Sequence, residues 1–421
     1  MVKRIFLFLT TFFLLTSSAL AQDIRVGIVN GQRSAVIETV NGEALLEGAG
    51  EIKAFLPGQS YLISVEQGIL KINGEKISAK TFVFYPKDEN AEIKVNKRSY
   101  RGAFSISILS SGNFLNVVNV LPVEEYLYGI LVEEVQPLWP EEALKAQVIV
   151  NRTMAYRAIR ENSQRPYDIA AIGSQSYYGK EAEKEEITVV IDATKGLVAT
   201  LQGTAIDAQS HASSGGRTEA GARQYLQSVL DFDQDCPEYE WEKIFSAKDI
   251  DIVVKYAGHD IGSLRGFDFS PMNIAKLDSL PDRGKSGRLK EIKIIAERGF
   301  ATIPGEQFAR MLGLPSSAFD IAVDNIIPQS VDIPITDRYG NVIGVKKMPV
   351  EVRGNVTFPP DRPNVQRVTW AENEKIIIRG RGKGSGLGFS QWGARGLALM
   401  GKDYETILAY YFPGTDVRKV Y

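Results

Sequence analysis

The stretch EEVQPLWPEEALKAQVIVNRTMAYRA, Glu133–Ala158, indicates how the middle of this chain folds. It opens with an acidic loop that contains Pro and Trp. It continues with apolar residues at a spacing near 3.6, which is typical of an amphipathic helix. Pro140 fits the first helical position, where its missing N–H costs nothing. The pattern predicts a helix from about Pro140 to Glu161, preceded by a loop that holds Glu134.

Glu134 is the candidate catalytic residue of this loop. A carboxylic acid among apolar side chains keeps its proton to a higher pH, which suits a general acid. Val135, Leu138 and Trp139 are candidates for that apolar surrounding. The alternative is that Glu133 and Glu134 are solvated acids near the positive end of the helix dipole.

Composition narrows the chemistry that this chain can carry out. The formal net charge is −2 with interspersed charges, so no nucleic-acid partner is indicated. Cys236 is the only cysteine, which rules out an internal disulfide, and His211 and His259 are the only histidines. Zinc hydrolases and Ser–His or Cys–His enzymes depend on well-placed histidines. Carboxylate chemistry is therefore favoured, and no metal and no cofactor are predicted.

The first 21 residues have the pattern of a secretory signal peptide. Basic residues at positions 3 and 4 precede a short apolar stretch and an A-x-A cleavage site that ends at Ala21. The expected location of the mature protein is the periplasm or the cell wall. An uncleaved membrane anchor is the alternative.

The remaining patterns predict an α+β fold that is rich in β-structure, with a long helix packed on mixed sheets and small β modules. Asn41-Gly42 and Asn73-Gly74 are pairs favoured in type I′ hairpin turns. We divide the chain into a signal peptide at 1–21, an N-terminal β-rich module at 22–113, a core at 114–244, an inserted β-rich module of unknown role at 245–373, and a C-terminal segment at 374–421 that returns to the core.

Several motifs resemble the sporulation stage II protein D (SpoIID) and LytB amidase-enhancer family, in the family's own order. The helix carries Ala143–Gln147, followed by Arg152-Thr153. The other motifs are Val118–Pro122, Glu124–Gly129, Ser174–Gly179, Thr194–Gly196, Ser210–Glu219, Ser390–Ala394 and Tyr410–Gly414. Glu134 matches the family's catalytic glutamate. The chain departs from the family pattern at Val135-Gln136, where Met-Pro is usual, and at Ser385, where a histidine is usual.

This resemblance implies a lytic transglycosylase, a lyase that cleaves the MurNAc–GlcNAc strands of peptidoglycan. One carboxyl group serves twice in such an enzyme: it protonates the leaving glycosidic oxygen, and then takes the proton of the C6 hydroxyl as the 1,6-anhydro ring closes. The alternative is a non-catalytic, peptidoglycan-binding enhancer of an N-acetylmuramoyl-L-alanine amidase. A purely structural envelope-binding module is a third possibility. The expected partners are glycan strands and, for the enhancer, a cell-wall amidase.

The polar and aromatic side chains of these motifs are the predicted substrate contacts, because amides bind hydroxyls and aromatic rings stack on sugars. They are Lys145, Gln147, Arg152, Gln175, Tyr177, Tyr178, His211, Ser213, Ser214, Thr218 and Gln391. The alternatives are a polar helix face, a core tyrosine and a tight glycine turn. The Gly-rich loop Arg379–Gly388 matches neither common phosphate-binding pattern, so no nucleotide is predicted.

Overall fold

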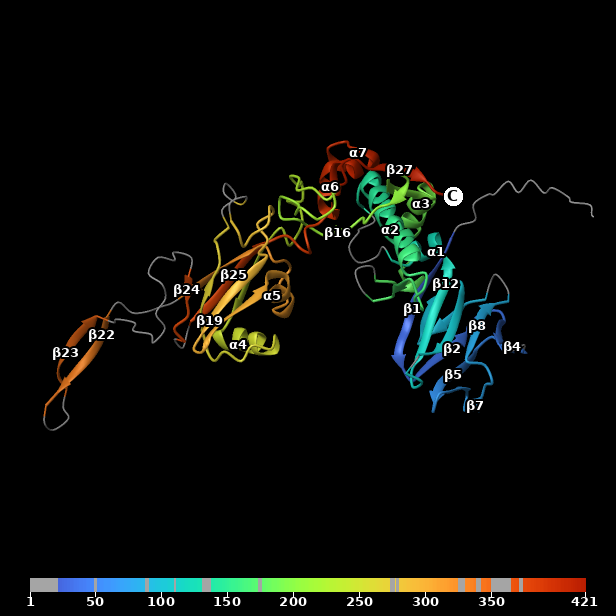
Figure 1. Cartoon of the computed structure of the whole chain (residues 1–421), viewed down its shortest axis with the longest axis horizontal. Helices are drawn as coiled ribbons and strands as arrows, with labels where there is room; N and C mark the ends of the chain where they lie inside the picture. The colour runs from blue at the N-terminus through green and yellow to red at the C-terminus, as the bar shows by residue number, and fades with distance from the viewer. Residues whose placement is uncertain are drawn as a thin grey trace, which may run out of the picture. The chain divides into compact units, whose positions relative to one another are not determined.

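The computed structural model describes residues 22–48, 51–87, 91–109, 111–130, 138–172, 176–272, 277, 280–324, 330–337, 342–349, 365–370 and 374–421. The fold is α+β, as predicted (Figure 1). The chain forms two compact units. Unit 1 comprises Met1–Val132, Asn151–Ile206 and Val417–Tyr421, and unit 2 comprises Glu133–Val150 and Asp207–Asp416. The domain limits drawn from the sequence stay a prediction.

The signal peptide predicted at 1–21 lies outside these ranges, and so do the predicted site residues Glu134 and Gln175 and the predicted apolar neighbour Val135. Within the described ranges, no helix is both long enough and apolar enough to cross a bilayer.

The N-terminal part of unit 1 consists of two antiparallel-rich sheets, in the strand orders β13-β1-β12-β11-β8-β3-β4 and β10-β9-β2-β5-β6-β7. The strands are β1 (Asp23–Gln32), β2 (Ser34–Thr39), β3 (Ala44–Gly48), β4 (Glu51–Phe55), β5 (Gln59–Glu66), β6 (Ile69–Ile72), β7 (Glu75–Lys76), β8 (Thr81–Pro86), β9 (Ile93–Val95), β10 (Arg98–Tyr100), β11 (Ala103–Ile108), β12 (Leu115–Pro122) and β13 (Ile169–Ala170). Buried and less buried residues alternate along many of these strands, as one buried face requires.

The two Asn-Gly pairs of this region behave differently. Asn73 and Gly74 both have positive φ and join the paired strands β6 and β7, which confirms the hairpin turn. At Asn41-Gly42 only the glycine has positive φ. The hairpin expected there is wrong, because β2 and β3 lie in different sheets. Asn41-Gly42 therefore marks a turn, but β2 pairs with β9 and β5, and β3 pairs with β8 and β4.

The second part of unit 1 contains the helix predicted from the opening stretch. Its elements are α1 (Val123–Tyr128), α2 (Glu141–Glu161), the 3₁₀ helix η1 (Gly179–Ala182), α3 (Glu185–Ala193), β14 (Leu197–Leu201), β15 (Thr204–Ala205) and β27 (Asp416–Lys419). Helix α2 confirms the prediction within one residue, and it contributes residues to both units. The sheet β15-β14-β27 brings the C-terminal strand back to the middle of the chain.

Unit 2 is built on the sheets β17-β25-β21 and β20-β19-β18-β24, with two further strand pairs, β16-β26 and β22-β23. Its elements are β16 (Ser210–His211), β17 (Glu240–Phe245), α4 (Ala247–Tyr256), β18 (Leu264–Asp268), β19 (Glu291–Ala296), β20 (Gly299–Pro304), α5 (Gly305–Met311), β21 (Phe319–Asp324), β22 (Ser330–Thr336), β23 (Val342–Pro349), β24 (Val365–Arg367), β25 (Lys375–Arg381), β26 (Phe389–Ser390), α6 (Gln391–Leu399) and α7 (Tyr404–Tyr411). Apolar residues of α4, α5 and the two larger sheets form one core.

The pattern of Lys375–Val417 predicts a strand, a Gly-rich loop and two helices, with Ser390 as a helix N-cap and Gly401 as a helix stop. The last segment of unit 2 has this order of elements. Ser390 caps α6, since its Oγ accepts a hydrogen bond from the backbone N of Gly393 at 3.2 Å. Gly401 follows α6 with a φ of +79°, which confirms the predicted helix stop. The parallel pair β16-β26 places His211 opposite Ser390.

Candidate functional site

Trp139, which lies just before α2, packs against α6. Trp139 is 7% exposed and packs edge-on against Trp392, with 5.1 Å between ring centroids. The backbone N–H of Trp392 donates to Ala212 O at 3.0 Å. Leu138 is 94% exposed, so Trp139 is the residue of the two that is packed. Trp139 is thus tied to α6 and, through Trp392, to the residue that follows His211.

A turn formed by residues 213–216, called here the Ser-Gly-Gly turn, is held by a buried aspartate. Asp233 Oδ2 accepts from Ser213 Oγ at 2.5 Å and from Gly215 N at 2.8 Å, and its Oδ1 accepts from Gly216 N at 3.0 Å. Burial raises the pKa of Asp233, and the neighbouring Asp231 raises it further, while the hydrogen bonds oppose this. The carboxylate therefore fixes the turn by side-chain and backbone bonds together.

Asp231 holds the same turn from the side of α6 and α7. Its Oδ2 accepts from Ser214 Oγ at 2.5 Å, and its Oδ1 accepts from Tyr411 Oη at 2.6 Å. Gly393 lies so close that a Cβ there would stand 1.7 Å from Asp231 Oδ1. The C-terminal motifs thus serve to build this network, which explains why a glycine is needed in the Ser390–Ala394 motif.

His211 is buried and electrically neutral at neutral pH. Burial lowers its pKa to about 3, and the charge of Arg288 acts in the same direction. Its Nδ1 lies 3.0 Å from Leu387 O, which favours the tautomer that donates from Nδ1. Its buried Nε2 finds no hydrogen-bond partner among the described residues. In this tautomer that nitrogen is an acceptor that no described residue satisfies and that solvent does not reach.

Arg288 and Glu219 join the inserted module to the Ser-Gly-Gly turn. Arg288 is buried, and its guanidinium donates to Ser214 O at 3.0 Å and to Gly384 O at 3.1 Å. Glu219 accepts in return from the backbone N and the Oγ of Ser286, at 3.2 and 2.6 Å. Segments that are distant in sequence are therefore fixed together within unit 2.

The glycines of the Gly-rich loop permit this close packing. A Cβ on Gly384 would stand 2.9 Å from the Cβ of His211, and one on Gly386 would stand 2.4 Å from the Arg288 guanidinium. Both glycines also have positive φ, which L-residues avoid. The Gly-rich loop can therefore pack its backbone directly on His211 and Arg288 because Gly384 and Gly386 have no side chains.

We expect Gly386→Ala to destabilise unit 2 by about 1–3 kcal/mol more than Gly401→Ala does. The two glycines have nearly equal φ values, +78° and +79°, but a Cβ on Gly401 meets nothing within 4 Å. The Gly401→Ala control should therefore lose only the free energy of the backbone strain, about 1–2 kcal/mol. Urea unfolding measures both changes, and equal losses would show that Arg288 moves aside freely.

The other predicted contacts of unit 2 are more buried than sugar ligands need to be. Ser213, Ser214 and Thr218 are at most 1% exposed. The Thr218 Oγ1 accepts from Val229 N at 2.8 Å. Gln147 and Gln391 are also buried, and Lys145 binds Glu141 and Glu142 on its own helix at 2.9 and 2.8 Å. In this conformation these side chains shape the site, and His211 Nε2 is an equally buried acceptor.

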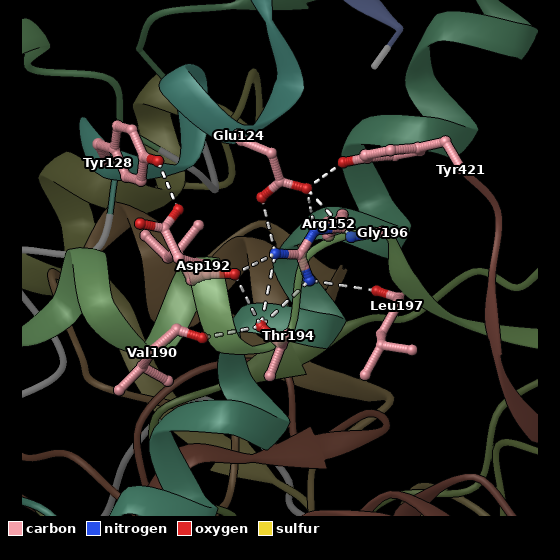
Figure 2. A network of polar contacts seen from close by, with 10 residues as sticks. Glu124, Tyr128, Arg152, Val190, Asp192, Thr194, Gly196, Leu197 and Tyr421 are labelled. Atoms are coloured by element: carbon pink, nitrogen blue, oxygen red, sulfur yellow. Dashed lines mark hydrogen bonds and ion pairs between the residues drawn. The ribbon is translucent and has the colours of Figure 1, made fainter. Parts of the chain in front are cut away.

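Arg152 lies in unit 1, in a buried network with Glu124 (Figure 2). Its Nε and Nη2 donate to the two Glu124 oxygens at 2.9 and 2.8 Å, and further bonds reach Leu197 O, Ile191 O and Thr194 Oγ1. Its side chain is 0% exposed. With every nitrogen engaged and no surface, Arg152 has a structural role in this conformation rather than a sugar contact.

Tyr177 and Tyr178 also belong to unit 1, and they differ in exposure. Tyr177 is 2% exposed and donates from Oη to Asn119 Oδ1 at 2.9 Å. Its ring lies so close to Gly129 that a Cβ there would meet it at 2.5 Å. Tyr178 is partly exposed, with the Arg98 guanidinium 5.3 Å from its ring centroid. Tyr177 is a core tyrosine, and only Tyr178 presents surface.

Sequence reasoning missed the acidic and basic residues that hold the site: Asp231, Asp233, Glu219 and Arg288. The i, i+2 pair Asp231-Phe232-Asp233 was a usable signal, because closely spaced acids in a mostly buried segment need partners. Within the described ranges, no group of three His, Cys, Asp or Glu side chains is placed to hold a metal ion.

The fold and the turn define an α+β protein whose polar site is built from its middle and C-terminal motifs. The family model described as SpoIID, Stage II sporulation protein, matches residues 111–201. Over that segment the chain is similar to the SpoIID family, and relatives named for stage II sporulation protein D and for an amidase enhancer bear out the resemblance and support a role connected with the cell wall.

Three relatives extend the similarity beyond that segment. An uncharacterised protein of Brachyspira hyodysenteriae is 26% identical over 87% of this chain and 84% of its own length. The amidase enhancer of Bacillus subtilis is 26% identical over 88% of this chain, which spans about half (52%) of that protein. Stage II sporulation protein D of Bacillus subtilis is 24% identical over 71% of this chain and 75% of its own length.

Proposed function

We propose that this protein is an exported lytic transglycosylase that cleaves peptidoglycan glycan strands, with Glu134 as the acid and then the base. The observation that best supports this is the packing of Trp139 on Trp392, whose backbone binds Ala212. Glu134 precedes Trp139 by only five residues in the sequence, which supports assigning its carboxyl group to the same site as the turn.

The proposed reaction is balanced without water or a second carboxylate. Glu134 gives its proton to the glycosidic oxygen as the bond from C1 to that oxygen breaks. The C6 hydroxyl oxygen of the muramic acid ring bonds to C1, and its proton returns to Glu134. General acid–base catalysis of this kind contributes about 10²–10⁴-fold in rate.

Product analysis tests this assignment. Mature protein is incubated with peptidoglycan and with strands stripped of stem peptides, and anhydro-muramyl ends are counted by mass spectrometry. We expect Glu134→Gln to reduce them about 10²-fold or more, because the amide cannot donate or accept the proton. Glu133→Gln is the matched control and should keep its activity. Anhydro ends at the wild-type rate in Glu134→Gln would refute the assignment.

Similarity to an amidase enhancer along most of this chain favours a second candidate function. In that case the protein binds peptidoglycan and activates a separate N-acetylmuramoyl-L-alanine amidase. Stimulation of an added amidase by wild type and by Glu134→Gln alike, with no anhydro products from either, would support the enhancer over the lyase.

A further inference from the structure

Two buried carboxyl groups converge on one hydroxyl group of the Ser-Gly-Gly turn. Ser214 Oγ lies 2.5 Å from Asp231 Oδ2 and 3.4 Å from Asp233 Oδ2. Both aspartates are buried, and they are called here the aspartate pair. We infer that the aspartate pair holds one proton, seated on Asp231 and relayed through Ser214, and that this proton stabilises the turn in a pH-dependent way. Acidification tightens the turn, and ionisation of the second carboxyl group loosens it.

The Ser214 hydroxyl has a single proton, so it can donate fully to one carboxylate at a time. When both aspartates are ionised, a lone pair of Ser214 Oγ faces the second carboxylate, and no proton lies between those two oxygens. One added proton completes the row. Asp231 then donates from Oδ2 to Ser214 Oγ, and Ser214 Oγ donates to Asp233 Oδ2. Each of these oxygens has a partner in that arrangement, as buried polar atoms usually do.

The hydrogen bonds of the two aspartates indicate which one carries the proton. Both oxygens of Asp233 accept from backbone N–H groups, those of Gly215 and Gly216, whose protons cannot turn away. The Oδ1 of Asp231 also accepts from a backbone N–H, at 3.0 Å. The Oδ2 of Asp231 differs, because its partner in the described part of the chain is the Ser214 hydroxyl, which can reverse its direction. A proton therefore fits on that oxygen without facing another donor.

The charge of Arg288 favours one proton on the aspartate pair. Its guanidinium is buried and acts on both aspartates, but it donates to the carbonyl oxygens of Ser214 and Gly384 rather than to either carboxylate. With one proton on the pair, the remaining carboxylate and the guanidinium cancel in charge. With none, a negative charge is left uncompensated, which burial makes costly. Burial and the charge of Asp231 accordingly raise the pKa of Asp233, and carboxyl groups this close titrate together.

The other titratable groups that face the aspartate pair are neutral at mildly acidic and neutral pH. Burial lowers the pKa of His211 to about 3. Burial raises the pKa of each of the others, which are Cys236, Tyr239, Tyr410 and Tyr411. The charged groups that act on these residues or on Arg288 from outside are at least partly exposed, namely Arg217, Glu219, Glu238, Glu240, Glu306 and Arg381. Solvent weakens the effect of such exposed charges.

The direction of the pH dependence follows from the raised pKa of Asp233. The folded turn binds a proton more tightly than the unfolded chain does, so the stability that this proton contributes is present in acid and is lost as pH rises through the folded pKa. His211 acts in the opposite direction, because its pKa is lowered. A variant that changes the aspartate pair and retains His211 therefore isolates the effect of the pair.

Urea unfolding of the full-length protein between pH 5 and pH 8 tests the shared proton. In Asp231→Asn, an amide N–H replaces the acidic proton and donates to Ser214 Oγ at every pH. We expect its urea midpoint to lie about 0.5 M above that of the wild type at pH 8, and closer to it at pH 5. Asp235→Asn is the matched control, because Asp235 is an exposed acid paired with Arg395, and it should follow the wild type.

The Asp233→Asn variant should behave in the opposite way. Its amide group would face the N–H of Gly215 or of Gly216, so a buried donor would lose its acceptor. We expect its urea midpoint to fall below that of the wild type at pH 5 and at pH 8 alike. Two carboxyl groups that merely hold the turn as ions would instead both be damaged by the change to Asn.

Carbon NMR of protein labelled with ¹³C-aspartate observes the proton in the wild type itself. We expect a carboxyl titration step above the ordinary pKa of 3.8 that is lost in Asp231→Asn and kept in Asp235→Asn. The absence of any such step that depends on Asp231 would overturn the shared proton. A midpoint of Asp231→Asn as low as that of Asp233→Asn at pH 8 would also overturn it. Neither measurement uses glycan cleavage, so failure of the shared proton and failure of the proposed lyase stay distinguishable.

Discussion

Arg152→Met is expected to lower the free energy of unfolding of unit 1 by about 3–5 kcal/mol. Glu124 is 6% exposed in its side chain and faces Arg152 through two bonds (Figure 2). Without the guanidinium, a buried carboxylate stays uncompensated, and the carbonyl oxygens of Leu197 and Ile191 lose their donor. Urea unfolding followed by circular dichroism measures the change.

A second substitution separates charge from packing. Glu124→Gln combined with Arg152→Met removes both charges, so we expect it to recover part of the loss. Arg298→Met breaks an exposed ion pair with Asp260 and should cost at most about 1 kcal/mol. A loss below about 1 kcal/mol in Arg152→Met would contradict the structural role given to this arginine.

The stability of unit 2 is expected to fall as acid is added, because of His211. Its folded pKa of about 3 lies below the ordinary value of 6.5. Below pH 6.5 the unfolded chain takes up a proton that the folded chain refuses, so the stability present above 6.5 is lost on acidification. At pH 4 this amounts to about 3 kcal/mol, at 1.36 kcal/mol per pKa unit.

The His211→Asn variant isolates this effect, because Asn does not titrate. The unfolding free energy of the wild type should drop about 3 kcal/mol more than that of the variant between pH 7 and pH 4. The raised pKa of Asp233 acts in the opposite sense, since its contribution is lost as pH rises, but both proteins retain it. His259→Asn is the control. Parallel curves for wild type and His211→Asn would show that the imidazole is solvated.

Local patterns predicted the elements better than the contacts between them. The α2 helix, the Ser390 cap and the Gly401 stop depend on neighbours within a few residues, so sequence alone indicated them. Arg152 was expected to face a substrate because its helical position does not reveal its partner. That partner, Glu124, lies 28 residues earlier. Helical spacing identifies a face, but it does not say what covers it.

The partners of the Ser-Gly-Gly turn could not be predicted from the sequence either. Its serines, Ser213 and Ser214, were predicted to bind a sugar, because they are polar and follow a strand. The structure turns the hydroxyls of Ser213 and Ser214 toward Asp233 and Asp231. Those aspartates lie 17 to 20 residues farther along, beyond the reach of any short motif. The roles assigned to Glu134 and Gln175 stay predictions.

The route of the chain through unit 1 has a consequence for the order of folding. Unit 1 leaves off at Ile206 and resumes at Val417, where β27 joins β14 and Tyr421 Oη donates to Glu124. During synthesis the intervening 210 residues emerge before that strand does. Such long-range pairing slows folding, since a large loop must close first. The edge of β14 in a nascent chain would therefore stay unpaired until Val417–Tyr421 has been synthesised, so unit 1 cannot be completed before nearly all of unit 2 has emerged.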